Sequence, residues 1–102
     1  MTEHAEDIVD DLREIILRIR DIEDSVERFQ TATQVVDEVR DTVLVELAAL
    51  RREAAVMARS KLINTTGMKH GEANRKLAEL AGTSPQTIAR MVNEQRQYGV
   101  DA

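Results

Sequence analysis

Two side chains near the end of the chain have the chemistry to recognise DNA bases. Gln86 and Arg90 are four residues apart in the segment "SPQTIARMVN", so on a helix they share a face. Gln can form two hydrogen bonds to adenine, and Arg can do the same with guanine. The sequence therefore predicts a helix whose early part presents Gln86 and Arg90 to the edges of base pairs in double-stranded DNA.

The residues before this helix predict a sharp turn. No Gly or Pro occurs before Gly67, whereas Gly82 and Pro85 are close together. Gly82 stands where a helix ends in a left-handed residue, and Ser84 followed by Pro85 is typical of a helix start. One helix must stop and another begin within a few residues, which is the geometry of a helix-turn-helix.

The apolar residues of this motif predict how it packs. Ala73, Leu77, Ala78 and Ala81 have the helical spacing to face inward from a helix that includes residues 72–80, and Ile88 and Met91 do so from the next helix. A third helix must come from upstream, around residues 54–62. We expect three residues of it (Met57, Ala58 and Leu62) to pack on Leu77, Leu80, Ile88 and Met91.

Residues 77–93 resemble the helix-turn-helix of the lactose-repressor family of bacterial transcription regulators. The resemblance lies in Leu77, Ala78, Ala81, Gly82, Ser84, Gln86, Thr87, Arg90, Val92 and Asn93. It implies that Pro85, Gln86 and Arg90 contact bases, and that Ser84, Thr87 and Asn93 lie nearer the phosphates. Because it covers only these residues, we carry over the family's role in DNA binding and not its response to a ligand.

Charge is divided unevenly along the chain. Residues 1–50 have 14 acidic and 5 basic side chains, a net charge of −9, whereas residues 51–102 have 9 basic and 5 acidic ones, a net charge of +4. Phosphates attract the second part and are repelled by the first. The basic residues before the recognition helix are Arg51, Arg52, Arg59, Lys61, Lys69, Arg75 and Lys76. We expect Lys69, Arg75 and Lys76 to contact the DNA backbone; ordinary surface variation is the alternative explanation of the charge division.

The acidic part predicts self-association. Apolar residues recur at alternating spacings of four and three at Ile8, Leu12, Ile15, Ile19, Ile22, Val26 and Phe29. This is the spacing of a heptad seam, and we expect these residues to form the interface of a homodimer. The acidic surface around them is also suited to a protein partner.

A second apolar series follows at Val36, Val39, Val43, Leu47, Leu50, Ala54 and Met57. Thr31 and Gln34 match a capping box between the two series, which favours a break there and a helical hairpin. The alternative is one long helix over residues 3–62, since no Gly or Pro enforces the break.

Other chemistries lack their residues. The chain has no Cys, which excludes a thiol nucleophile and Cys-ligated zinc. His4 and His70 have no helical His partner, and Ser60 and Ser84 have no evident His partner. We expect no enzymatic activity, no metal and no cofactor. The N-terminus is acidic and no apolar run approaches the roughly 18 residues of a membrane span, which predicts a cytoplasmic, nucleoid-associated protein.

Together these features predict an all-α protein. An acidic helical dimerisation segment, residues 1–62, takes the form of a hairpin or a long coiled-coil-like helix, and residues 63–102 form the helix-turn-helix segment. The expected function is sequence-specific binding of double-stranded DNA as a dimer by a small bacterial or phage transcription regulator. The alternatives are an interaction module built on the acidic helices, and a DNA-targeting accessory of recombination or plasmid or phage machinery.

Overall fold

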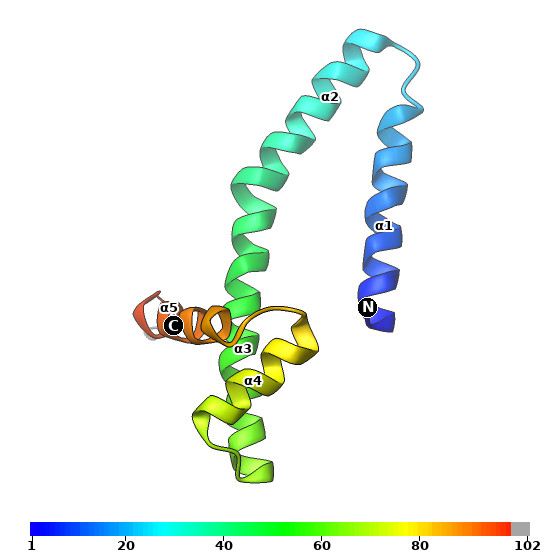
Figure 1. Ribbon diagram of the computed structural model, residues 1–102. Coiled ribbons are helices and arrows are strands. Elements are labelled where there is room, and N and C mark those ends of the chain that lie inside the picture. The colour runs from blue at the N-terminus through cyan, green and yellow to red at the C-terminus, as the bar shows by residue number, and fades with distance from the viewer. Residues whose placement is uncertain (99–102) are drawn as a thin grey trace. The chain divides into compact units, whose positions relative to one another are not determined.

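The computed structural model describes residues 1–98, which form an all-α chain, as expected (Figure 1). Its elements are α1 (Glu3–Arg20), α2 (Ser25–Glu38), a π-helical segment η1 (Val39–Val43), α3 (Leu44–Thr66), α4 (His70–Ala81) and α5 (Pro85–Tyr98). The chain divides into two compact units, Met1–Val43 and Leu44–Ala102. Residues 99–102, which end the expected helix-turn-helix segment, lie outside the described residues.

In the first unit, α1 and α2 run in opposite directions and are joined by residues 21–24 (Figure 1). The hairpin is therefore present, but the predicted position of its break at Thr31 is wrong, because Thr31 lies inside α2. The Asp24 carboxylate caps α2 by accepting a hydrogen bond from the Val26 amide at 2.9 Å. The Arg28 guanidinium donates to the Ile22 carbonyl at 3.1 Å and ties the loop to α2.

The second apolar series continues on helical backbone from Ser25 to Thr66, through α2, η1 and α3, without a non-helical residue. The last of these helices ends at Thr66, where the predicted end was residue 62. Gly67 follows with φ 72°, and its amide donates to the Ile63 carbonyl at 3.0 Å. A left-handed glycine after the last helical residue satisfies a carbonyl that the helix leaves free.

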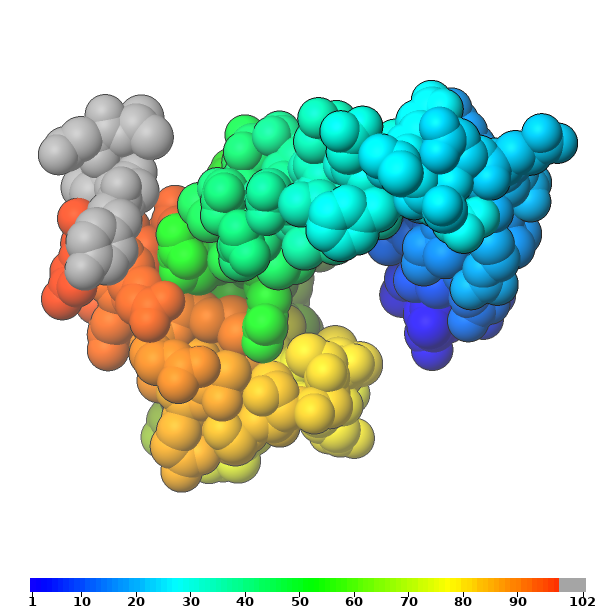
Figure 2. Space-filling view, turned by 90° about the horizontal axis from the view of Figure 1, so that it is seen from above, coloured from blue at the N-terminus to red at the C-terminus, as the bar shows by residue number. Residues whose placement is uncertain are grey.

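The second unit packs α4 and α5 on α3 and on each other. The buried side chains belong to α4 and α5: Ala73, Ala78, Ile88, Met91 and Val92. In the space-filling view the yellow atoms of α4 adjoin the orange atoms of α5 (Figure 2). Four of these five residues were predicted to face inward, and the upstream helix was predicted to complete the unit, so this part of the packing prediction is confirmed.

Three predicted packing residues are instead exposed. Met57 and Leu80 retain 65% and 69% of their accessible surface, and Ala81 is exposed as well. Leu77, Ala58 and Leu62 are half-buried. Helical spacing indicates that an apolar residue shares a face with others, but it does not determine how far the neighbouring helix covers that face.

We predict that Gly82→Ala lowers the free energy of unfolding by about 1 kcal/mol, because the left-handed backbone disfavours a side chain. Gly82 has φ 67°, and a Cβ placed there meets no atom within 4 Å, so the loss reports backbone strain without a clash. Urea unfolding followed by circular dichroism measures it. The control is Gly71→Ala inside α4, which should raise stability by about 0.5 kcal/mol. Equal effects of the two substitutions would contradict the assignment.

Candidate nucleic-acid interface

The turn between α4 and α5 is closed by backbone hydrogen bonds. The Thr83 amide donates to the Ala78 carbonyl at 2.9 Å, and the Gly82 amide donates to the Glu79 carbonyl at 3.4 Å. This pair of bonds around a left-handed glycine is a Schellman motif. The predicted role of Gly82 as the end of the first helix is confirmed.

Ser84 begins the next helix, as predicted. Its hydroxyl oxygen accepts a hydrogen bond from the Thr87 amide at 3.2 Å, and its carbonyl accepts from the same amide and from that of Ile88. Pro85 is the first residue of α5, where its missing amide costs nothing. The direction of α5 is therefore set by local bonds within a few residues of the turn.

The outward face of α5 carries polar side chains only. Gln86, Arg90, Asn93 and Gln97 are exposed, and their spacing places them on one side of the helix, opposite Ile88 and Val92. We call these four residues the α5 outer face. It brings together three residues expected to contact DNA and adds Gln97, which the sequence analysis missed. The sequence did contain a signal for Gln97, because it follows Asn93 by four positions and so continues the helical spacing of Gln86, Arg90 and Asn93.

The remaining residues expected on α5 lie at its edges. Pro85 and Thr87 are half-buried, and the hydroxyl groups of Thr87 and Ser84 are 2.9 Å apart. Ser84 and Thr87 therefore use their polar groups first to form the turn. Their exposed atoms remain at the N-terminus of α5, where the helix dipole favours a negative charge.

Arg90 is accessible but not isolated. Its guanidinium Nε is 3.8 Å from a carboxylate oxygen of Glu94, and the two side chains are 68% and 40% exposed. Glu94 also lines a shallow depression with Arg51 and Arg52 of α3. An exposed pair at this distance contributes on the order of 0–1 kcal/mol, so Arg90 can exchange this partner for another at small cost.

The basic residues expected on the DNA backbone are exposed on α4 or just before it. Lys69 is the N-cap residue of α4, while Arg75 and Lys76 lie along it. Glu72 and Glu79 are exposed on the same helix and share its outer side by spacing. The outer side of α4 therefore has a mixed charge and does not form a continuous basic patch.

A further pair of cations lies where α3 meets α5. Burial, and then repulsion from Arg96, lowers the pKa of Arg59. Arg59 is half-buried and Arg96 is exposed. Arg59 was among the basic residues singled out in the sequence, whereas Arg96 was missed because it falls at the edge of the α5 outer face.

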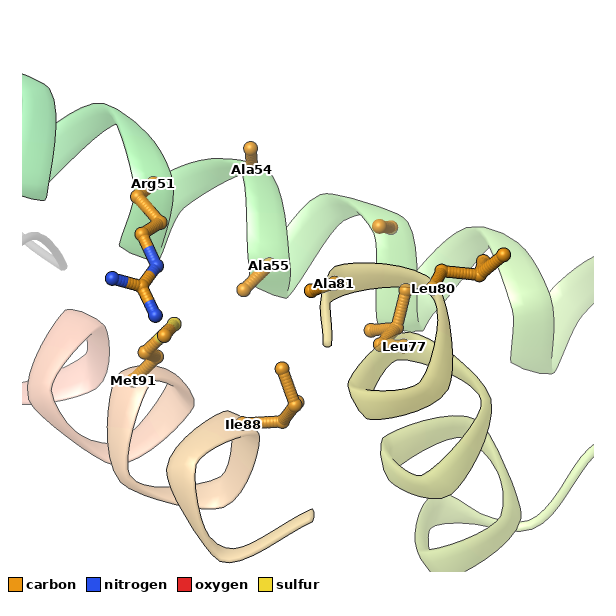
Figure 3. A pocket seen from close by; sticks show the side chains of 9 residues that line it. Arg51, Ala54, Ala55, Leu77, Leu80, Ala81, Ile88 and Met91 are labelled. Atoms are coloured by element: carbon orange, nitrogen blue, oxygen red, sulfur yellow. The ribbon is translucent and has the colours of Figure 1, made fainter. Parts of the chain in front are cut away.

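An open apolar groove of about 270 Å³ lies between α3 and the helix-turn-helix. Figure 3 shows Ile88 and Met91 of α5 and Leu77 of α4 directed toward α3, with Arg51 at one end. Ala54, Ala55 and Ala58 line its α3 side. Small side chains on α3 leave this space because they do not fill the gap between the three helices.

The residues expected at the dimer interface do not form one helical stripe, because residues 21–24 interrupt it. Ile22 lies in the loop and is half-buried, as is Ile19. Ile8, Leu12, Ile15, Val26 and Phe29 are exposed at 41% to 71%. Most of the apolar surface on which the expectation of a dimer depends is therefore uncovered in the single chain.

Comparison of the chain with protein-family models, curated proteins and solved structures finds no match. Within residues 1–98, no helix has both the length and the apolar composition needed to cross a membrane. The same residues contain no cluster of three or more His, Cys, Asp or Glu side chains that could hold a metal ion.

We predict that Ser84→Ala lowers the free energy of unfolding by about 1 kcal/mol, because the Thr87 amide loses its side-chain acceptor. Ser84→Asp, which keeps an acceptor at the N-cap, should leave stability within about 0.5 kcal/mol of the parent protein. Chemical denaturation of the three proteins side by side measures this. A loss of the same size in both variants would mean that the cap does not stabilise α5.

Proposed function

We propose that the chain binds double-stranded DNA sequence-specifically as a homodimer and acts as a small transcription regulator. The observation that carries the proposal is the α5 outer face. It holds Gln86 and Arg90 in the first half of a helix that is fixed by a Schellman turn and an N-cap. The resemblance of residues 77–93 to the lactose-repressor family supports the same function.

The α5 outer face has the donors that base recognition requires. Arg90 can donate two hydrogen bonds to guanine, and Gln86 can bond the edge of adenine. Asn93 lies further along the helix and is exposed, so we assign it a contact with a phosphate or a sugar. Recognition helices contact bases mainly through their N-terminal residues, which is where Gln86 and Arg90 lie on α5.

Contacts with the DNA phosphates would orient α5 in the major groove of the duplex. The positive end of the α5 helix dipole lies beside Ser84, and Lys69, Arg75 and Lys76 are exposed nearby in the chain. Such contacts carry affinity but no sequence information. A homodimer would present two copies of α5 to two half-sites, so the target would be a palindrome whose half-sites are about one helical turn, or a multiple of it, apart.

A second candidate function is an interaction module. The observation in its favour is the first unit, in which apolar side chains such as Leu12 and Phe29 are exposed at 52% and 71% among acidic residues. A protein partner could cover them. Salt-sensitive DNA binding separates this candidate from the first. A DNA-targeting accessory of recombination or plasmid or phage machinery would use the same DNA contacts and differs only in its partners.

We predict that Arg90→Ala reduces discrimination between target and random duplex by about 1–3 kcal/mol, because a bidentate base contact is lost. Lys76→Ala should weaken target and random duplex equally and lower the salt slope of binding by about 1. The measurement is selection of bound sequences from random duplexes, followed by titration of the selected site at two salt concentrations.

The matched control is Arg13→Ala, which removes an exposed arginine from α1 where Asp10 lies 3.5 Å away. This variant should retain both affinity and specificity. Absence of DNA retention by the parent protein at low salt would overturn the proposal in favour of the interaction module. Equal losses of specific and random binding in Arg90→Ala would overturn only the role of Arg90.

A further inference from the structure

α3 is apolar on two sides, and only one of them is covered within the second unit. The side toward α4 and α5 includes Ala55, Val56, Leu62 and Ile63, which are half-buried. The second side carries Leu47, Leu50, Ala54 and Met57, which are all exposed, and Ala54 also lies at the edge of the groove between α3 and the helix-turn-helix. We call these four residues the α3 outer face. Its three large side chains are exposed at 54%, 59% and 65%.

The spacing of the α3 outer face is that of a coiled-coil seam. Its residues are separated by three, four and three positions, which corresponds to a and d positions of two successive heptads. Leu47 and Ala54 take the a positions, and Leu50 and Met57 take the d positions. Lys61 occupies the next a position and ends the apolar series. A face of this kind is complementary to a second helix with the same pattern.

Charges beside the seam distinguish between the two ways in which identical helices can pair. In this register Glu46 and Glu53 occupy g positions and Arg51 occupies an e position. A parallel pair brings g of one helix to e of the other, so Glu46 meets the partner's arginine. An antiparallel pair brings g to g and e to e, which sets glutamates against each other and arginine against arginine.

Glu46 and Arg51 are free to make this contact. Both are exposed, and within residues 1–98 neither belongs to an ion pair closer than 4.0 Å. From the apolar spacing and the flanking charges we propose that two copies of the chain associate through the α3 outer face as a parallel, in-register helix pair, with Glu46 of each copy beside Arg51 of the other.

This interface adds a surface that the sequence analysis did not assign to the dimer. Leu80 of α4, exposed at 69%, lines the same groove as Ala54, so the partner helix also reduces the exposure of the groove edge. The helices α4 and α5 cover the other side of α3 and are not displaced. The interface is independent of DNA binding and can be tested without any duplex.

Single cysteines provide the test, because the chain has none of its own. We make Leu50→Cys and, separately, Met57→Cys in the full chain. In a parallel, in-register pair each d residue meets its own copy, so mild oxidation should convert most of both proteins to disulfide-linked dimers. Glu79→Cys, at an exposed position of α4, is the control and should give a several-fold smaller dimer fraction.

Crosslinking at only one of the two positions would overturn the parallel arrangement, because antiparallel helices bring at most one identical pair together. Crosslinking at neither position, with helicity by circular dichroism equal to that of the parent, would overturn the interface itself. Both residues are exposed, so the substitutions remove no core contact. DNA retention by the parent protein is scored separately, so that failure of the interface and failure of the proposed function are distinguishable.

A charge exchange tests the orientation independently. In the Leu50→Cys background, Glu46→Arg alone and Arg51→Glu alone should each lower the crosslinked fraction several-fold, and the double substitution should restore it. Lack of restoration would contradict the proposed pairing. Leu12→Asp in α1 is the control for association through the first unit and should leave crosslinking at position 50 unchanged; loss of crosslinking in that variant would assign the contact to α1.

Discussion

The packing of α4 in the second unit, where it contacts both α3 and α5, depends on small side chains. Ala73 and Ala78 are 0% and 3% exposed, although neither side chain extends beyond Cβ. A larger residue at either position would have to displace the facing helix, because cores are packed nearly as densely as crystals. This constraint keeps α4 packed closely in the second unit, and the position of the α5 outer face depends on that packing because α5 lies against α4 and α3.

The turn between α4 and α5 sets the direction in which α5 runs. Gly82 reverses the chain in a left-handed conformation, and Ser84 immediately supplies the acceptor that starts α5. Because the hydrogen bonds lie within a few residues of one another, the geometry of the motif is determined locally. Ile88, Met91 and Val92 then bury the inner side of α5, which leaves Gln86 and Arg90 outside. The same local bonds thus separate an apolar side that packs from a polar side that is free to bind.

These local features are also the part of the structure that the sequence predicts best. Gly82, Ser84 and Pro85 are residue types with strong backbone preferences, so their roles follow from identity and order alone. The inward positions of Ala78, Ile88 and Met91 follow from helical spacing. The hairpin break was placed wrongly although its signal was present: Asp24 is followed three residues later by Glu27, which matches a capping box as well as Thr31 and Gln34 do.

What the sequence could not determine is which apolar surface is covered, and by what. A heptad-like series continues through residues 21–24 although the helix does not, because periodicity reports the spacing of side chains and not the conformation between them. Met57 and Leu80 were expected in the core, yet both are exposed, and Leu80 lines an open groove. Their types indicate burial, but only the packing of α3 shows that the chain itself leaves them uncovered. The π-helical segment Val39–Val43 likewise had no signal that we used.

The position of Glu94 bears on how the proposed DNA contacts could be selective. A carboxylate beside Arg90, in a depression that also contains Arg51 and Arg52, lowers the positive charge along one edge of α5. It therefore opposes binding to any phosphate backbone, whatever the sequence. The ion pair itself is weak because both side chains are exposed, so a guanine that offers two acceptors can replace it at little cost. In the proposed function, Glu94 would therefore weaken binding to random DNA more than binding to the target. Arg90 would give specificity through its contact with guanine, and Glu94 would add to it because its carboxylate competes with phosphates for Arg90.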